Sequence, residues 1–495
     1  MWLIVRLLRH KSSFSRLTLT NFSFRMESTG QRGKIQISQD TADLLVAAGK
    51  MSWIAPREER VVAKGKGEMQ TFWVNIGTTI DVSAFQDGMG SLDDSLSYEE
   101  GPFSTLSPKT TRLVLWNVEI LLDMLRQIHV LRGKTTSTFR EIIVRSEERH
   151  TTAYDEVEDV IQFPPYNGQA AEIDTDGVEI KPEVEQQLED FISTIASMYI
   201  ENPFHDFAHA SHATMGVVKL LSSLVKAKPG EYSDVQNASY LIASNPLVQF
   251  AMVLSVICHD VDHPGASNAI LLSEKSRMAS VYGYKSVAEQ NSLDLTWDLL
   301  MDDNYAELRA AIYRTEEEKQ LFRQVLVNSV ISTDLFDQRL KDRFESRWKV
   351  GFPNESHGDQ GTSKNLQATL IMETMVQAAD IAHTMQHWQV YRKWNLRLFE
   401  EMYQGFVDGR TSSDPSDFWF EGELQFYNNY TLPLVRRLRQ SGAFVTASTD
   451  SHQDYAEQNK RQWENKGKDI VAEMVDATRA KITARMKEGP HGLDE

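Results

Sequence analysis

The sequence is poor in cysteine, since Cys258 is the only one among 495 residues. An intramolecular disulfide is therefore impossible, and a zinc cluster built on several thiolates is excluded. Cys258 directly precedes His259, so it could be a nucleophile, but a lone cysteine in an apolar run serves more often as a small buried side chain. We favour the buried interpretation.

Positive charge is scarce as well. Lys and Arg together number 52 against 70 Asp and Glu, which gives a formal net charge of −18. Without an excess of cationic side chains to meet phosphates, a general nucleic-acid binder is excluded. No apolar run is long enough to span a bilayer. With 41% hydrophobic and 25% charged residues, the composition is otherwise that of an ordinary globular protein.

Acidic residues are absent from the start of the chain until Glu27. Residues 1–20 combine several basic residues with short apolar runs, "WLIV" and "LL". This pattern resembles an amphipathic organelle-targeting segment. The alternative is that the true start of the protein lies elsewhere, and both interpretations stay open.

Residues 21–77 mix strand-like and helix-like runs. "GKIQISQ" alternates apolar and polar residues as a strand does, "TFWVNI" is a second strand-like run, and "DTADLLVAAG" begins with a helix-capping Asp-Thr pair and ends at Gly49. Residues 78–109 are acidic and rich in Gly and Ser, and they contain Pro102 and Pro108. We interpret them as a linker.

Helical patterns dominate the remainder of the chain. Residues 110–149 open with an apolar stripe at three- and four-residue steps, formed by Leu113, Trp116, Ile120, Met124, Ile128 and Leu131. The stripe predicts a connector helix that packs on a core, with a dimerising helix as the alternative. Residues 150–490 give weak strand signals and predict one large all-helical domain. The predicted fold class is therefore mainly α, with a small partial α/β segment at the N-terminus.

Two histidine pairs occur within these helical patterns. "NPFHDFAHASH" places His205 and His209 four residues apart, and "CHDVDH" gives His259 and His263 the same spacing around Asp260. If each pair lies on a helix, its two imidazoles share one face and can enter one cavity. The two pairs therefore predict a site that gathers several imidazoles.

Carboxylates accompany the imidazoles. Asp260 follows the apolar run "FAMVLSVI", and burying an ionisable group there is costly unless it is paired or binds a metal. Asp380, in "VQAADIAHTMQHW", follows the small Ala378 and Ala379, which allow another group to approach closely. Imidazole nitrogen with carboxylate oxygen suits zinc, whereas oxygen and water suit magnesium or manganese. The alternative is a set of hydrogen-bonded core or surface histidines.

The motifs resemble the catalytic domain of the class I 3′,5′-cyclic nucleotide phosphodiesterases. "HDVDHPGASN" matches the signature His-Asp-x-x-His-x-x-x-x-Asn through His259, Asp260, His263 and Asn268. "FHDFAHASH", "SVAEQNS", "STD", "AADIAH", "YRKW" and "PLVRRL" also occur in the family's order. The resemblance extends over residues 150–485.

The resemblance implies a compact helical domain with two divalent ions at the bottom of a pocket. It assigns His209, His259, Asp260 and Asp380 to the tighter ion, usually zinc. It also implies that Asp260 reaches a second ion, usually magnesium, for which manganese is an alternative. Two such cations activate water and neutralise charge on the phosphodiester.

The resemblance also assigns roles outside this ligand set. By its position, His205 would be the general acid that protonates the departing 3′ oxygen, a role that suits the ordinary pKa of imidazole. His263, Asn268 and Glu289 would hold the water around the ions.

The sequence departs from the family pattern close to the expected substrate. Phe204 and Asp206 flank the acid where the family has Tyr and Asn, and His383 follows the last ligand where the family often has Asn. "AEQNS" keeps Glu289 but differs at the next three positions. We expect Phe204, Asp206 and His383 to contact the substrate.

Two further residues correspond to the family's base pocket. Counting back from "TLPLVRRL", Phe426 falls where a phenylalanine stacks on the purine, and Glu423 falls where a glutamine reads the purine edge. A carboxylate only accepts hydrogen bonds unless it is protonated. Guanine offers N1–H and an amine on that edge, whereas adenine offers only its amine, so Glu423 favours cGMP slightly. The alternative places Glu423 on a solvated helix face.

Residues 21–77 resemble the C-terminal end of a class III adenylate or guanylate cyclase domain. Asn21 and Arg25 match the spacing of that family's phosphate-stabilising pair, and Lys64 or Lys66 matches its phosphate-binding lysine. The family's metal-binding aspartates lie upstream, where this sequence has no acidic residue. We therefore predict a remnant, or the tail of a longer cyclase–phosphodiesterase fusion, without cyclase activity of its own.

The sequence thus predicts a metal-dependent enzyme of cyclic nucleotide signalling that hydrolyses the 3′ ester of cAMP, cGMP or both to the 5′-monophosphate. The alternatives are another His-Asp metal phosphohydrolase and a non-catalytic module that binds cyclic nucleotides. The expected partners are the cyclic nucleotide and either a cyclase chain or a second copy bound through the connector helix. The expected location is the cytoplasm, alone or as the cytoplasmic part of a longer membrane cyclase.

Overall fold

The computed structural model divides the chain into two compact units, residues 1–99 and residues 100–495. The structure describes residues 35–39, 42–43, 54–57, 61–63, 67–74, 106–133, 152–164, 173–175, 177–224, 234–353 and 363–488.

Several predictions fall outside the described residues. These are the targeting segment 1–20, most of the linker 78–109, the end of the connector beyond Gly133, most of the helix predicted in "DTADLLVAAG", and the cyclase-like residues Asn21, Arg25, Lys64 and Lys66.

The first unit contains short antiparallel strands. They are β1 (Ile35–Ser38), β2 (Ile54–Pro56), β3 (Val61–Ala63), β4 (Gly67–Met69) and β5 (Thr71–Val74). Strand β5 lies between β1 and β2, with Ile37 opposite Phe72, while β3 pairs with β4. The strands predicted in "GKIQISQ" and "TFWVNI" are therefore confirmed as β1 and β5.

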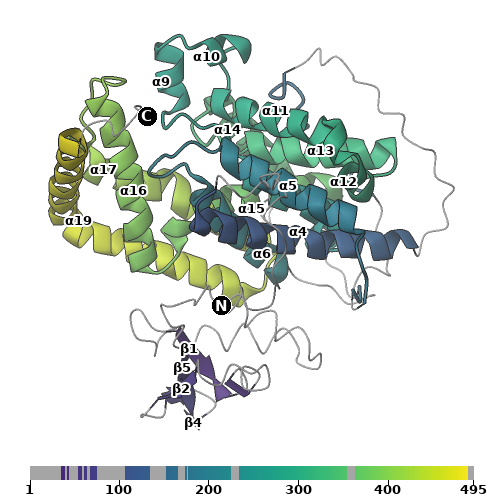
Figure 1. The fold of residues 1–495 in the computed structure, drawn as a ribbon. Coiled ribbons are helices and arrows are strands. Elements are labelled where there is room, and N and C mark those ends of the chain that lie inside the picture. The colour runs from purple at the N-terminus through teal and green to yellow at the C-terminus, as the bar shows by residue number, and fades with distance from the viewer. Residues whose placement is uncertain are drawn as a thin grey trace, which may run out of the picture. The chain divides into compact units, whose positions relative to one another are not determined.

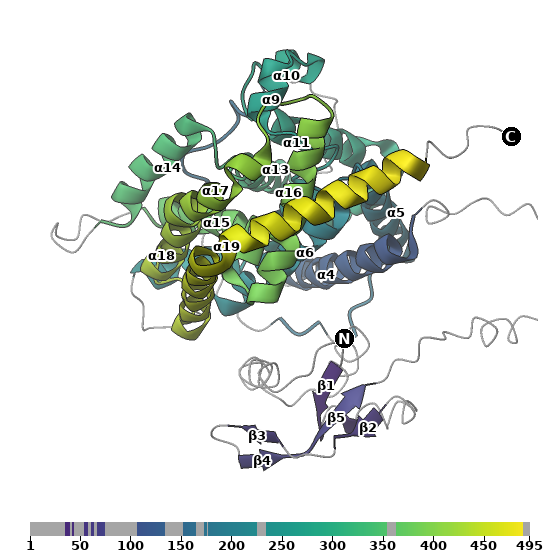
Figure 2. The same ribbon diagram turned by 90° about the vertical axis from the view of Figure 1, so that its left-hand side faces the viewer.

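The second unit is built from helices, which confirms the mainly α fold class (Figures 1 and 2). Its first half contains α4 (Pro108–Gly133), α5 (Pro182–Met198), α6 (Phe207–Ser223), α7 (Asp234–Ala243), α8 (Pro246–Cys258), α9 (Asn268–Ser273), α10 (Arg277–Val281), α11 (Val287–Met301), α12 (Ala306–Ile312) and α13 (Glu316–Ile331). Its second half contains α14 (Gln338–Gly351), α15 (Lys364–Asp380), α16 (Trp388–Val407), α17 (Trp419–Phe426), α18 (Leu432–Gln440) and α19 (Thr446–Glu488). Short helical turns named η4 (Asp303–Tyr305), η5 (Ala382–Met385), η6 (Pro415–Asp417) and η7 (Tyr427–Thr431) connect them.

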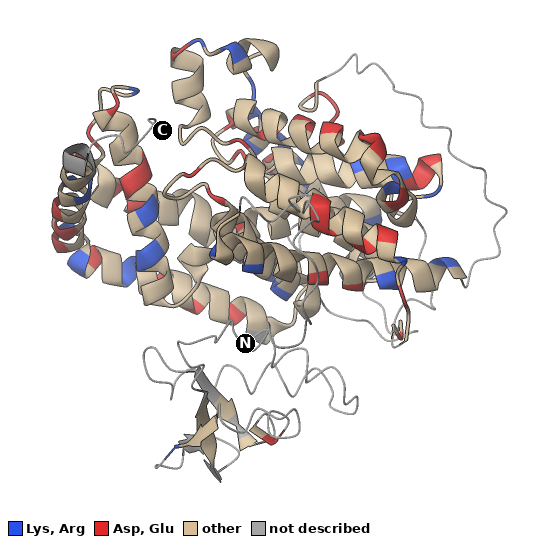
Figure 3. Cartoon of the chain, in the orientation of Figure 1, with Lys and Arg blue, Asp and Glu red and all other residues tan. Residues whose placement is uncertain are grey.

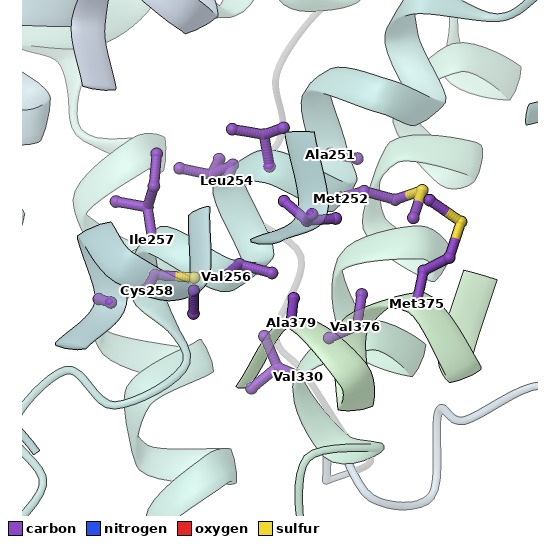
Figure 4. Packing of buried hydrophobic residues seen from close by; sticks show 14 of the residues in the cluster. Ala251, Met252, Leu254, Val256, Ile257, Cys258, Val330, Met375, Val376 and Ala379 are labelled. Carbon is purple, nitrogen blue, oxygen red and sulfur yellow. The ribbon is translucent and has the colours of Figure 1, made fainter. Parts of the chain in front are cut away.

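Helix α8 is the central element of this unit. It starts at Pro246, and the side chain of Asn245 caps it by accepting from the N–H groups of Leu247 and Val248. Nearly every α8 residue is buried, because α4, α6, α13 and α15 all pack against it. Figure 4 shows α8 side chains gathered near Val330 of α13 and Met375 of α15. A helix that is apolar all round belongs in the centre of a large helical core.

Cys258 ends α8 and is fully buried. Burial raises the pKa of its thiol to about 12, so the reactive thiolate is not formed at neutral pH. The interpretation of Cys258 as a small buried side chain is confirmed.

The connector helix is integrated into this core. Helix α4 packs against α5, α6 and α8, and the buried Asn117 donates to Ser211 Oγ of α6 at 3.0 Å. The predicted stripe is only partly correct, because the most buried face runs through Val114, Leu121 and Leu125. Each of these residues directly follows a predicted one in the sequence. The buried face of α4 is therefore rotated about the helix axis relative to the predicted stripe.

Helices α6 and α15 approach closely at a glycine. A Cβ added at Gly216 of α6 would lie 3.1 Å from the Cα of Ala379, the residue before Asp380 at the end of α15. The small residues that the sequence places before Asp380 therefore do allow close approach. This contact brings the carboxyl end of α15 beside α6.

Charged residues of both signs occur along α16 and α19 (Figure 3). Two ion pairs join these two helices, Lys481 Nζ to Glu400 Oε2 at 2.6 Å and Arg392 to Glu473 Oε2 at 3.5 Å. Within the described ranges, none of the helices combines the length and the apolar character needed to cross a membrane.

We expect Gly216→Leu to separate α6 from α15 and to destabilise the protein by about 1–3 kcal/mol, the usual cost of overpacking. Thermal unfolding measures the loss, and metal analysis of the purified protein should show reduced binding. Gly405→Leu is the control, because a Cβ at Gly405 of α16 meets nothing within 4 Å. Equal stability of the two variants would contradict the proposed role of the α6–α15 contact.

Candidate active site

The apolar helix α8 ends in a polar turn that begins at His259. The turn reverses direction at Asp262, whose φ is 58°, a left-handed conformation that aspartate tolerates better than most residues. Two residues of α11 hold it: Ser292 Oγ donates to Val261 O at 2.7 Å, and Asn291 Nδ2 donates to Asp262 Oδ2 at 3.1 Å. The positions where "AEQNS" departs from the family therefore support this turn.

The prediction that each histidine pair shares one helix face is wrong. His205 precedes α6, whose N-cap is Asp206, and His263 lies beyond the end of α8. His205 and His209 instead lie on either side of the start of α6, and His259 and His263 both lie in the turn that follows α8. The rings that stack come from different pairs, since those of His205 and His263 lie 3.9 Å apart at 30°.

The four predicted metal ligands do converge. His209 Nε2 lies 3.0 Å from Asp380 Oδ1 and 3.6 Å from Asp260 Oδ2. His259 Nε2 lies 3.1 Å from Asp260 Oδ2 and 3.3 Å from Asp380 Oδ1. All four side chains are largely buried. The start of α6 and the ends of α8 and α15 thus deliver two imidazoles and two carboxylates to one point.

The protonation state of His259 shows whether this centre requires positive charge. Its Nδ1 lies 2.9 Å from the Val256 carbonyl, which can only accept, so Nδ1 carries a proton. In the neutral imidazole, Nε2 is then a bare acceptor facing the acceptor oxygens of Asp260 and Asp380. Burial opposes a charged imidazole, but the two carboxylates outweigh it and raise the pKa of His259 well above its usual value. The centre therefore requires positive charge, from a proton or a cation.

The spacing fits a divalent metal ion. Ligand atoms about 2.0–2.2 Å from one ion lie about 2.8–3.6 Å from each other in tetrahedral or octahedral arrangements. The four distances above fall in this range. Among the described residues, the buried His259 Nε2 and Asp260 Oδ2 also have no hydrogen-bond partner. These residues can hold a metal ion, and their mixed nitrogen and oxygen donors suit zinc.

His205 is held by a residue that the sequence interpretation missed, Glu401 of α16. The Glu401 carboxylate bonds His205 Nδ1 and accepts the backbone N–H groups of Phe204 at 2.8 Å and of His205 at 3.0 Å. Burial alone would lower the pKa of His205, but Glu401, Asp260 and Asp380 together raise it to about 9. His205 is therefore held as an imidazolium whose Nδ1 is engaged.

A second cluster of polar side chains, formed by Asn268, Glu289 and Asp334, lies beyond the predicted metal ligands. Asn268 Nδ2 donates to Glu289 Oε2 at 2.9 Å and to Asp334 Oδ2 at 3.1 Å. Burial, followed by the neighbouring Asp334, raises the pKa of Glu289 to about 8. Asp334 belongs to the motif "STD", which was noted in the sequence without a role for this residue. Burial and His205 lower the pKa of His263 to about 3, so His263 stays neutral.

The residues predicted to contact substrate lie around this centre. Phe204 is buried, with its ring 4.5 Å from His209 and 5.6 Å from His383. Asp206 caps α6 by accepting from His209 N at 2.8 Å, and its other oxygen accepts from Arg397 at 2.5 Å. The buried His383 lies in η5, and its Nδ1 has no partner among the described residues.

The predicted base-pocket residues come from α17. Glu423 is half-buried and accepts a hydrogen bond from the buried Tyr391 at 2.7 Å. Burial raises the pKa of Glu423 to about 7, against the opposing effect of that hydrogen bond. Phe426 stacks on Tyr430, with ring centroids 5.2 Å apart at 28°, so one of its faces is occupied within the protein.

A paired His-Asp centre in a helical unit is a donor set that could hold metal ions. Comparison with known families is more specific. Residues 204–441 match the family of 3′5′-cyclic nucleotide phosphodiesterases, and residues 17–76 match the adenylate and guanylate cyclase catalytic domain. Residues 204–441 are thus similar to the phosphodiesterase family, and a segment similar to part of a cyclase domain precedes them.

Curated relatives include the cGMP-specific 3′,5′-cGMP phosphodiesterase 3 of Dictyostelium discoideum, 26% identical over 287 residues. The match covers 56% of this chain and 55% of that protein. A probable 3′,5′-cyclic-AMP phosphodiesterase of Caenorhabditis elegans is 26% identical over 219 residues, which cover 43% of this chain and 29% of the relative. The chain therefore spans about half or less of the length of these relatives.

A solved structure, the phosphodiesterase domain of the RhoPDE fusion protein from the choanoflagellate Salpingoeca rosetta, aligns with a TM-score of 0.48 and 17% sequence identity. The alignment covers 76% of this chain and 98% of that one.

We expect Asp380→Ala to lose most of the metal bound at the His209 and His259 centre, because it removes an anionic ligand. The metal affinity should fall by more than the roughly 10–100-fold that follows when a residue that only hydrogen-bonds to a ligand is removed. Metal analysis after dialysis against zinc measures it, with Asp342→Ala, an exposed carboxylate of α14, as the control. Full zinc occupancy in Asp380→Ala would remove Asp380 from the ligand set.

Proposed function

We propose that this chain hydrolyses the 3′ ester of cyclic nucleotides to the 5′-monophosphate. The supporting observation is the convergence of His209, His259, Asp260 and Asp380 beside a protonated imidazole, His205. A fixed centre that can bind cations, next to a proton donor, is what cleavage of an anionic phosphodiester needs. The similarity of residues 204–441 to the phosphodiesterase family agrees with this assignment.

The four ligands would hold zinc, and Asp260 would also reach a second ion, magnesium or manganese. Together, the two ions would supply the charge that activates water and neutralises the phosphate. His263, Asn268 and Glu289 lie close by and would order water there.

His205 would act as the general acid. Glu401 engages Nδ1, so Nε2–H is the proton that remains to be given to the departing 3′ oxygen. The same carboxylate keeps the imidazole charged before the reaction and stabilises its orientation. Phe204 packs against His209 and His383 and would exclude water from this side.

Glu423 would read the purine edge. One of its oxygens accepts from Tyr391, which leaves the other for the base. As a carboxylate that oxygen accepts from guanine N1–H and the amine, whereas it would face the lone pair of adenine N1. A slight preference for cGMP follows, and Phe426 would offer its remaining face to the ring.

The proposed catalytic domain is helical and extends over residues 150–490, and the connector 110–149 precedes it. The cyclase-like segment 21–77 is inactive by itself. A cyclase chain or a second copy of this chain remains the proposed partner.

Product analysis tests the function. The purified chain, supplied with zinc and magnesium, should convert cAMP and cGMP to 5′-monophosphates, and a chelator should stop the reaction. Formation of 3′-monophosphates, or binding without turnover, would favour the rival phosphohydrolase or the non-catalytic module.

We expect His205→Asn to lower kcat by roughly 10²–10⁴ with normal metal content, the usual range for general acid catalysis. Glu401→Gln should lower the pKa of His205 from about 9, because it removes the main charge that raises it. Since a general acid works only while protonated, the alkaline fall of kcat should move to lower pH. Glu400→Gln, the neighbour whose carboxylate pairs with Lys481, is the control. If kcat falls at the same alkaline pH in Glu401→Gln as in the parent protein, His205 is not the general acid.

The preference for cGMP should depend on pH. The pKa of Glu423 is about 7, so the carboxylate dominates above pH 7 and the acid below it. The ratio of kcat/KM for cGMP over cAMP should therefore be highest above pH 7 and fall as the pH drops through 7, by up to roughly tenfold for one mismatched polar contact. Glu423→Gln should show a flat profile. The same slope in both proteins would place Glu423 outside the base pocket.

A further inference from the structure

The long helix α19 contacts the turn that follows the metal ligand Asp380. Asn459 of α19 is buried, and its side-chain amide donates to Thr384 O at 3.1 Å and to Gln386 O at 2.7 Å. Both amide hydrogens are therefore used to hold the end of η5. These contacts join segments that lie more than 70 residues apart in the sequence.

Other buried side chains converge on the same turn. Tyr427 Oη donates to Thr384 O at 3.4 Å, and Thr431 Oγ1 lies 3.4 Å from Thr384 Oγ1. The ring of Tyr427 lies 5.7 Å from that of Tyr391. Thr384 of η5 is thus held by side chains from both α19 and η7.

Thr384 links two residues that are proposed to contact the substrate, His383 and Glu423. His383 directly precedes Thr384 in η5, and its buried Nδ1 lacks a partner among the described residues. On the other side, Tyr391 neighbours Tyr427 and donates to Glu423 at 2.7 Å. The contacts that hold Thr384 therefore fix the backbone next to His383. They also fix Tyr427, which packs against Tyr391, the residue that donates to Glu423.

We propose that Asn459 is a positioning residue for base recognition, through which α19 sets the separation between His383 and Glu423. The proposal rests on the proposed function, because it assigns the purine edge to this pocket. Asn459 touches neither substrate nor metal ligand. Its effect passes through the carbonyls of Thr384 and Gln386.

The chemistry requires an amide at this position. Thr384 O and Gln386 O are acceptors, and only a side chain with two N–H donors at one atom serves both. A carboxylate at the same place faces two carbonyls without a donor, and an apolar side chain leaves both carbonyls without their buried partner. Either change releases the end of η5 while the metal ligands keep their own supports.

The test compares Asn459→Asp and Asn459→Leu with Asn465→Asp, which introduces the same carboxylate at an exposed position of α19. Thr431→Val is a milder variant on the same turn, and it keeps the side-chain shape if an Asn459 variant fails to fold. For each protein, zinc content, kcat and KM for cAMP and cGMP are measured. Binding of AMP, GMP and ribose 5-phosphate is measured in parallel, since the last compound lacks the base.

We expect the Asn459 variants to raise KM roughly tenfold with a smaller change in kcat, to change the cGMP-to-cAMP ratio, and to keep zinc. AMP and GMP should bind more weakly and ribose 5-phosphate as in the parent, with Thr431→Val showing a weaker form of the same pattern. Parent-like nucleotide binding, or an equal loss for ribose 5-phosphate, would overturn the proposal. If the parent binds nucleotides but does not turn over cyclic substrates, the proposed function fails and binding still decides the role of Asn459. If the parent shows no base-dependent binding, both proposals fail.

Discussion

A largely buried centre in which acceptor atoms face each other constrains the whole helical unit. The carboxylates of Asp260 and Asp380 lie 3.0–3.6 Å from imidazole nitrogens of His209 and His259. Such groups are costly to bury together and tolerate each other only around positive charge. The apolar packing along α8 must supply the free energy that holds them in place without that charge. A core that is hydrophobic on every side of α8 provides a rigid support of this kind.

The positions of the helix ends follow from this demand. Side chains at helix termini can converge from three directions, whereas two residues on one helix face stay parallel. Here α6 contributes its first turn and α15 its last residue, while His259 and Asp260 follow directly after the end of α8. The glycine at position 216 allows the α6 and α15 backbones to approach, which no larger residue would permit without a shift. Packing at one point of the core therefore sets the distance between ligands at another.

The sequence predicted the helical class, the ligands that converge and the buried cysteine, because those signals are local. It mispredicted how the histidine pairs lie, since spacing alone does not distinguish a helix face from a helix end. Glu401 could not be found from the sequence, because it lies 196 residues beyond His205 in an ordinary helical pattern. Asn459 was missed for the same reason: its partners are backbone carbonyls, which leave no trace in residue identity.

Asp206 shows how a departure from a family motif is understood through its contacts. An aspartate in place of asparagine adds a negative charge close to the metal ligands, which would oppose the carboxylates already there. In this structure, one oxygen of Asp206 caps α6 through His209 N, and the other accepts from Arg397, whose guanidinium also lies 4.6 Å from the Trp394 ring. The added charge is therefore neutralised locally, and the cap on the helix that carries His209 becomes charge-assisted. The charge of Asp206 thus supports the first turn of the helix that carries His209, a role that the family motif does not indicate.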